Sequence, residues 1–182
     1  MGIEADADLT DALVQQYWRD VEHLVANVLR AQVPCTADML GSACFGALVR
    51  RLIVERRDLG TLRQARRIVS GGWLAKQHEL QALPWLGELV RLESALADMT
   101  EALTVQRRSL VEVLHFRSDW DVVQLHEWWR RGTPGVAPSL CARVAALIVG
   151  RSGRVRILRL PCVPPSNSQA GRAEFATVRP GG

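Results

Sequence analysis

The sequence predicts an α+β protein, an N-terminal helical bundle followed by a small C-terminal antiparallel β-sheet or hairpin. Apolar side chains recur at helical spacing through roughly the first hundred residues. After Arg108 the apolar residues fall instead into short runs with many β-branched side chains, separated by glycine-containing turns. We therefore expect a helical bundle over residues 1–108, a small α/β appendage over residues 109–163 and a flexible tail over residues 164–182.

Four amphipathic segments account for the predicted bundle. The first ends before Pro34, and the side chain of Thr36 or Asp38 can cap the second. The third stops at the glycine pair 71–72. Pro84 opens the fourth, in a first turn where proline is tolerated. The predicted helices cover residues 9–30, 36–53, 59–69 and 84–99.

The second half of the chain predicts strands around one more helix. Residues 110–116 form a short β-branched run, and residues 119–129 can form a helix with Ser118 as its cap. Two apolar runs, residues 142–149 and 154–160, flank a Gly-Arg-Ser-Gly turn and predict a β-hairpin. In its second arm Arg154 and Arg156 alternate with apolar residues, so one face of that arm should meet water.

Composition and charge narrow the possible partners. The net charge is +4 and the pI is about 9.3, but the cations are interleaved with acids in the first half of the chain. This pattern favours a solvated mixed-charge surface over a nucleic-acid surface. No apolar run approaches the roughly 20 residues that span a bilayer. The acidic N-terminus lacks the features of a signal peptide, so we expect no membrane partner and a cytoplasmic location.

Motifs for catalysis and metal binding are absent from the sequence. It contains no phosphate-binding glycine loop and no nucleophile elbow. Its four cysteines form no Cys-x-x-Cys pair, and its histidines complete no zinc spacing. We expect no catalytic residue, no bound metal and no cofactor in this chain.

The predicted helix at 119–129 carries a possible interface. Val122, Leu125 and Trp129 share one helical face, which predicts that Trp129 is a core residue and Trp128 the more exposed one. An exposed tryptophan beside Arg130 is typical of protein interfaces, where aromatic and arginine side chains dominate binding energy. The alternative is that Trp128 is an ordinary packing residue.

One segment resembles the signature of a known protein family. Residues 83–93 match the pattern Leu-Pro-x-Leu-x-(Asp/Glu)-Leu-x-Arg-Leu-Glu, through Leu83, Pro84, Arg91, Leu92 and Glu93 among others. The family was once labelled DNA-binding. Its members accompany multinuclear iron-dependent oxidases that modify ribosomally made peptides.

Three weaker features support the resemblance by their order along the chain. Gly41 and Phe45 are similar to the family's Gly-x-x-x-Phe turn, residues 117–122 to its strand-to-helix junction, and residues 141–160 to its hairpin. The match covers residues 10–160. Two features depart from the pattern: residues 17–20 are Tyr-Trp-Arg-Asp where the family has Tyr-Arg-x-Asn, and the C-terminal part is short. Both departures point to the compact partner subunits, similar to those of 3-thiaglutamate and, more distantly, methanobactin biosynthesis.

The resemblance implies a heterodimer. The companion would be a TIM-barrel oxidase subunit that holds the iron ions and oxidises a cysteine of the precursor peptide with oxygen. The small subunit would help to recruit that ribosomal precursor. The predicted peptide-binding residues are Arg154, Arg156 and Ile157, because the edge of a hairpin can accept an extended peptide as an added strand.

Three other interpretations remain open at this stage. The sheet could simply cover the helical bundle, with its arginines in water. The chain could be a DNA-binding regulator, with Arg63, Arg66 and Arg67 as the best basic cluster. It could also be an enzyme that acts alone, which would require activity from the purified chain.

Overall fold

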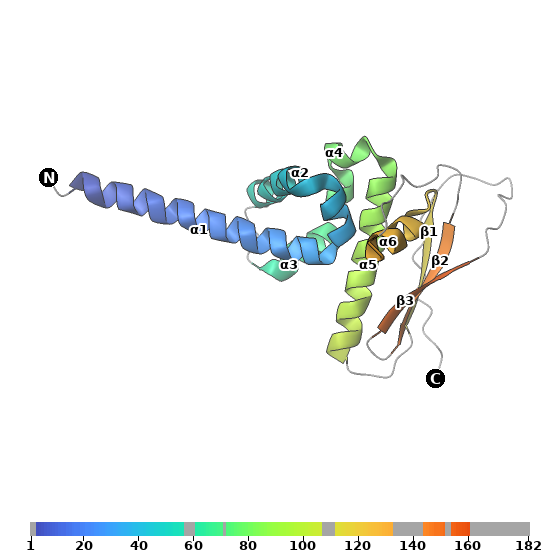
Figure 1. Ribbon diagram of the computed structural model, residues 1–182. Coiled ribbons are helices and arrows are strands. Elements are labelled where there is room, and N and C mark those ends of the chain that lie inside the picture. Colours follow the sequence, from blue (N-terminus) through green and yellow to red (C-terminus); the bar gives the residue numbers. More distant parts are fainter. Residues whose placement is uncertain are drawn as a thin grey trace. The chain divides into compact units, whose positions relative to one another are not determined.

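The computed structural model describes residues 3–56, 61–70, 72–106, 112–132, 144–151 and 154–160 (Figure 1). The chain forms two compact units, Met1–Val69 and Ser70–Gly182. Helices precede a three-stranded antiparallel sheet on the C-terminal side, which confirms the predicted α+β class. Within these ranges no helix is both long enough and apolar enough to cross a membrane.

The first unit is built on two long helices. α1 (Ile3–Gln32) packs against α2 (Pro34–Glu55), and α3 (Leu62–Ser70) follows. The C-terminal part of α1 buries Val25 and Leu29, whereas the side chains of residues 11–20 are all exposed. The helix predicted over residues 9–30 is therefore present. Many of its apolar side chains, however, lie at the surface and not in the core. Apolar residues of α2 and α3 complete the buried set: Phe45, Leu48, Val49, Leu52, Ala65 and Val69.

The ends of α2 and α3 are set by local chemistry. Val33 is the N-cap of α2 and makes no side-chain cap, because Pro34 itself opens the helix. The prediction that Thr36 or Asp38 caps α2 is thus wrong. At the start of α3, Thr61 Oγ1 accepts from the backbone N–H of Gln64 at 3.3 Å, and Gln64 Oε1 accepts from the N–H of Thr61 at 2.9 Å. This reciprocal pair is a capping box.

The second unit is organised around α5 (Pro84–Gln106). Two short elements precede it, the 3₁₀ helix η1 (Leu74–Lys76) and α4 (His78–Gln81), and neither was predicted. α5 contacts both of them, as well as α6 (Val122–Arg130) and all three strands. Its buried residues follow helical spacing: Leu86, Leu89, Val90, Leu92, Glu93, Met99 and Leu103.

The sheet consists of β1 (Glu112–Ser118), β2 (Val144–Arg151) and β3 (Arg154–Arg159), in the order β1-β2-β3. Both pairings are antiparallel. Leu114 lies opposite Ile148, and Ile148 lies opposite Ile157. The predicted hairpin is confirmed, because β2 ends at Arg151 and β3 begins at Arg154.

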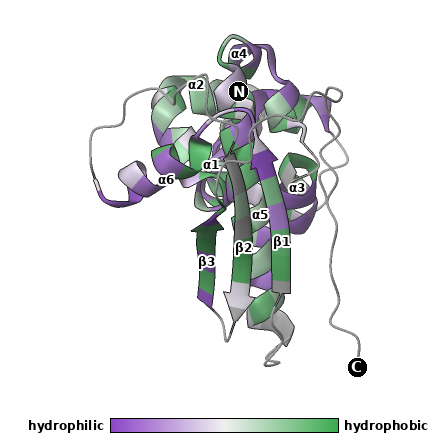
Figure 2. Cartoon of the chain, turned by 90° about the vertical axis from the view of Figure 1, so that its right-hand side faces the viewer, coloured by the Kyte–Doolittle hydropathy of each residue, from purple (hydrophilic) through white to green (hydrophobic). Residues whose placement is uncertain are grey.

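One face of the sheet packs against α5 (Figure 2). Phe116, Ala146 and Ile148 are buried on this face. Gly150 allows the helix to approach closely: a Cβ atom there would lie 2.6 Å from Leu103 Cδ1 and 2.9 Å from Met99 Sδ. Because α5 packs on the sheet, the compact units divide the chain after residue 69, whereas the sequence suggested a division after residue 108.

Candidate peptide-binding surface

The outer face of the sheet is the side of β1–β3 that lies away from α5. Side chains alternate between the two faces of a strand, and paired residues share a face. The register therefore places Val113, Val149 and Arg156 in one cross-strand row of the outer face. The neighbouring row includes His115 and Leu158, both exposed. No described helix of the second unit covers this face in Figure 2.

Every charged side chain described on the outer face is an arginine. Arg154 and Arg156 of β3 are exposed near one end of the face, as the sequence predicted. Arg117 of β1 is exposed near the other end, four residues further along the register, or about 13 Å at 3.3 Å per residue. Between them lies the row of His115 and Leu158, and the half-buried side chains of Val113 and Val149 lie in the row of Arg156. The outer face thus combines an apolar centre with cations at both ends.

The edge of β3 is the second feature of this surface. Among the described strands, β3 pairs with β2 alone, so the backbone N–H and C=O groups on its other side can pair with an extended chain. Ile157, predicted to join the peptide site, has its side chain on the other face of the sheet. It is half-buried opposite Ile148, so it packs with the core of the sheet and not beside Arg154 and Arg156.

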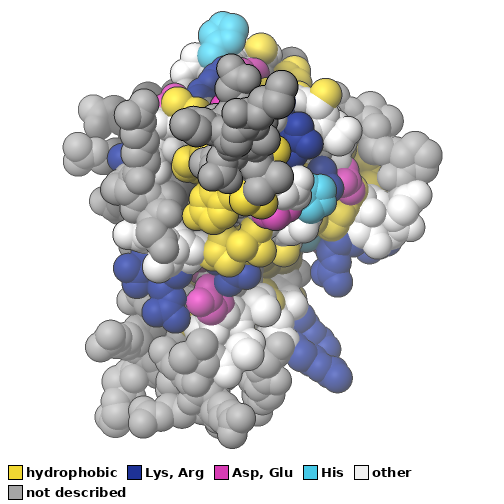
Figure 3. Space-filling model, turned by 90° about the vertical axis from the view of Figure 1, so that its left-hand side faces the viewer, with side chains coloured by type: hydrophobic (Ala, Val, Ile, Leu, Met, Phe, Trp, Pro, Cys, Tyr) yellow, Lys and Arg dark blue, Asp and Glu magenta, His cyan; other side chains and the backbone are white. Residues whose placement is uncertain are grey.

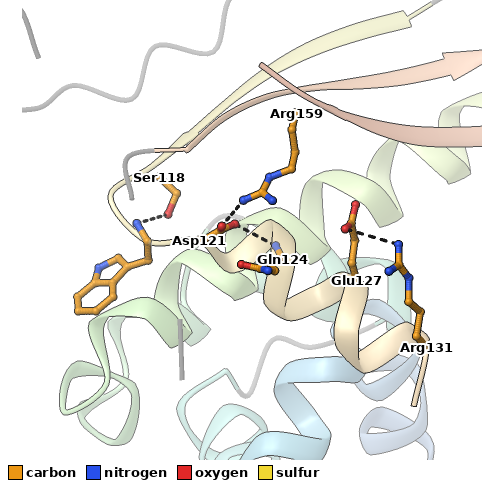
Figure 4. A network of polar contacts seen from close by, with 7 residues as sticks. Ser118, Asp121, Gln124, Glu127, Arg131 and Arg159 are labelled. Carbon is orange, nitrogen blue, oxygen red and sulfur yellow. Dashed lines mark hydrogen bonds and ion pairs between the residues drawn. The ribbon is translucent and has the colours of Figure 1, made fainter. Parts of the chain in front are cut away.

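A polar network fixes the end of β3 to the start of α6 (Figure 4). Asp121 is buried and is the N-cap of α6: its Oδ1 accepts from the backbone N–H of Gln124 at 3.1 Å. Its Oδ2 pairs with the guanidinium of Arg159, on the face of the sheet toward α5. One carboxylate therefore holds both a helix start and the edge strand. Ser118, the predicted cap, accepts instead from the N–H of Trp120 at 3.1 Å, in the turn before α6.

The predicted interface on α6 is only partly exposed. Trp128 is half-buried, as is Trp129, and Arg130 is exposed in the last turn. His126 is buried next to Trp129, with ring centroids 5.8 Å apart. Burial and, to a smaller extent, the nearby charge of Arg130 together lower the pKa of His126 to about 4. At the C-terminal end of α6, Glu127 and Arg131 form a long ion pair of 4.0 Å at the surface (Figure 4).

The glycine of the upstream motif makes a backbone bend. Gly41 interrupts α2 with φ 73° and ψ 161°, a backbone conformation that residues other than glycine rarely adopt. Four residues later Phe45 is buried, and the guanidinium of Arg30 lies 5.6 Å from the centre of its ring. Gly41 and Phe45 therefore serve the packing of the first unit.

The residues of the central motif are also structural. Pro84 is the first residue of α5, Leu83 precedes it at the surface, and Leu92 and Glu93 are buried. Arg91 pairs with Glu88 of its own helix at 2.6 Å, and its guanidinium lies 5.9 Å from the centre of the Phe116 ring. Arg91 thus links α5 to β1 of the sheet.

The outer face and the edge of β3 offer arginine side chains and backbone groups that can bind a peptide. Within the described ranges, no group of three His, Cys, Asp or Glu side chains is placed to hold a metal ion. The pattern within residues 154–157 identified Arg154 and Arg156 from the sequence, whereas Arg117, His115 and Leu158 were not predicted. The alternation of polar and apolar residues within 112–118 was a signal for them, but the pairing of β1 with β2 was needed to place them on the same face.

Comparison of the sequence with models of known protein families and with curated proteins finds no match.

Proposed function

We propose that this chain is a non-catalytic partner subunit. It would bind a TIM-barrel multinuclear iron oxidase in the cytoplasm and recruit a ribosomally made precursor peptide, whose cysteine the oxidase modifies. The observation that carries the proposal is the outer face of the sheet, with Arg154 and Arg156 beside the edge of β3. The iron belongs to the companion subunit in this account, and no cofactor is assigned to this chain.

The edge of β3 supports binding of an extended peptide. A peptide that adds as a fourth strand gains backbone hydrogen bonds along β3, and its alternate side chains then lie over the outer face. These side chains would meet Leu158 and the two arginines of β3. Because α5 and the Asp121–Arg159 pair hold the sheet from the other side, the edge is presented on a fixed scaffold.

The charges of the outer face favour an acidic leader segment. An arginine donates to a carboxylate through two N–H groups, and such charge-assisted bonds are stronger than neutral ones. Cations at both ends of the face also attract an acidic peptide during association.

The assignment to an oxidase partner rests on the motif at residues 83–93 and on the order of the weaker motifs. The structure accounts for the motif residues as packing and helix-start residues, which suits a scaffold subunit. The motif thus supports the family, and the outer face of the sheet supports the role in recruitment.

The direct test is peptide binding by the intact complex. The double substitution Arg154→Glu and Arg156→Glu should weaken the affinity for the precursor peptide at least tenfold, because each charge-assisted hydrogen bond contributes about 1.5–3 kcal/mol. Fluorescence anisotropy of the labelled precursor measures the affinity, and circular dichroism checks the fold.

The matched control reverses two other exposed arginines. Arg63→Glu with Arg67→Glu, in α3, changes the net charge from +4 to 0 just as the β3 pair does, since each reversal removes two charges. This control should leave peptide affinity within about twofold, because it alters only the overall field. Equal losses in both double variants, or no loss in either, would overturn the assignment of the peptide to β3.

A DNA-binding regulator remains the second candidate, because α3 exposes Arg63 and Arg67 one helical turn apart. This function predicts affinity for duplex DNA that falls steeply with salt and depends on sequence. It also predicts that the α3 double variant, and not the β3 double variant, abolishes binding. Weak binding that is independent of sequence would count against it.

A further inference from the structure

The N-terminal half of α1 presents an apolar surface that its own unit does not cover. We define the α1 stripe as Leu13, Val14, Tyr17, Trp18 and Leu24, whose exposed fractions are between 49% and 64%. The spacings of three, four and seven residues that relate Leu13, Val14, Tyr17, Trp18 and Leu24 place them along one side of the helix. Figure 3, seen from the side on which α1 begins, shows hydrophobic side chains gathered at the surface.

The exposed apolar area of the α1 stripe is larger than that of apolar residues scattered singly over a surface. Five side chains of this kind, each about half exposed, present on the order of 500 Å² of mainly apolar area. Patches of this size on a monomer mark interaction sites. The stripe also holds an aromatic pair: the rings of Tyr17 and Trp18 are 5.7 Å apart and meet edge to face. Tyrosine and tryptophan are the side chains that most often dominate an interface.

The helix itself also requires a partner. All side chains of residues 11–20 are exposed, so this part of α1 gains nothing from packing within its unit. This segment extends a helix of 30 residues, and the valine, tyrosine and tryptophan in it are only moderate helix formers. A partner that covers the stripe would stabilise the helix as well as bury the side chains.

The charges beside the α1 stripe indicate what that partner carries. Asp20 lies one turn from both Tyr17 and Leu24, and Asp11 lies one turn before Val14. Glu22 is already paired with Arg50 of α2, at 2.7 Å. Arg19, the first cation of the chain, lies on the opposite side of the helix from Tyr17. The stripe is thus bordered by acids, which favours a basic partner and disfavours a second copy of the same stripe.

We infer that the α1 stripe is the docking surface for the companion subunit, and that it receives an amphipathic helix whose apolar row is flanked by lysine or arginine. This inference rests on the proposed function and adds the surface and the chemistry of the contact. It separates two surfaces on the chain: the outer face of the sheet receives the peptide, and the α1 stripe receives the companion.

The experiment measures the affinity of full-length variants for the proposed companion, a TIM-barrel iron oxidase subunit. Tyr17→Ala and Trp18→Ala should each raise the Kd roughly 10- to 100-fold, as aromatic residues at the centre of an interface do. Arg19→Ala, on the far side of the same helix, is the matched control and should stay within about twofold. Circular dichroism verifies the helix content of each variant.

A second variant tests the charge argument without removing apolar surface. Asp11→Lys with Asp20→Lys should slow association and abolish the weakening of the complex by salt that the unchanged chain shows. If the complex forms but no variant differs from Arg19→Ala, the docking inference is wrong and the proposed function stands. If the unchanged chain forms no complex with the companion, both the docking inference and the proposed function are wrong. A homodimer that Tyr17→Ala converts to monomers would also overturn the inference, because the stripe would then bind a second copy.

Discussion

Leu92 and His126 show how single side chains determine the stability of the second unit. Leu92 is fully buried in α5, as its place in the apolar stripe predicted. His126 is buried in α6, although histidine is often a surface residue, and its Nδ1 has no hydrogen-bond partner among the residues that the structure describes. Leu92 stabilises the core through contacts with its neighbours, and His126 makes the stability of the fold depend on pH.

Replacing Leu92 with alanine should destabilise the protein by about 2–5 kcal/mol, because it removes buried methyl groups and leaves a cavity. Urea or thermal unfolding followed by circular dichroism measures the change. Leu83→Ala is the control: this leucine is 44% exposed just before α5, and its loss should cost less than about 1 kcal/mol. Equal costs for the two substitutions would show that α5 presents another face to the core.

Acid should destabilise the fold through His126. Its pKa in the folded protein, about 4, is below the ordinary value of 6.5, so the unfolded chain binds the proton more tightly. The contribution of neutral His126 is therefore complete above pH 6.5 and is lost as the pH falls toward 4, by at most about 3 kcal/mol. His126→Gln should flatten the slope of unfolding free energy against pH between 4 and 6.5, relative to the unchanged protein. Parallel slopes would mean that His126 is protonated in the folded state.

At the scale of elements, sequence periodicity predicted the existence and type of the long helices and of the β2–β3 hairpin. Periodicity was less successful where a contact between residues distant in sequence helps to set the start of an element. The start of α6 falls at Asp121 because that carboxylate also pairs with Arg159, a contact between residues 38 positions apart that no local pattern contains. The short elements η1 and α4 are too brief to show a helical period.

The packing of α5 on the sheet predicts the effect of a glycine substitution. Gly150→Ala should destabilise the protein by about 1–3 kcal/mol, because its Cβ would overlap Leu103 and Met99 unless these side chains move. The matched control is Gly87→Ala within α5, where the new Cβ would meet Ala75 at 3.7 Å, an ordinary contact distance. The control should stabilise the helix by about 0.5–1 kcal/mol. Chemical denaturation compares the two, and a stabilising Gly150→Ala would show that α5 does not approach β2 so closely.

For the whole molecule, the sequence predicted part of the candidate site. Arg154 and Arg156 were identified because polar and apolar residues alternate in one strand, and this alternation reports which side chains share a face. Arg117 and Leu158 joined them only through the pairing of β1, β2 and β3, which depends on contacts distant in sequence. The exposure of Tyr17 and Trp18 could not be predicted either, since an apolar stripe has the same pattern whether it faces a core or a partner.

The central claim is that this chain acts as the partner subunit of an iron oxidase. It is tested most directly by co-expressing the chain with the proposed TIM-barrel oxidase subunit and determining the native mass and iron content of the purified product. We predict one copy of each subunit in a single complex. Iron should be lost when the companion is omitted, because within the described ranges this chain places no group of metal ligands together. Two species that elute separately, or stoichiometric iron bound by this chain alone, would contradict the account.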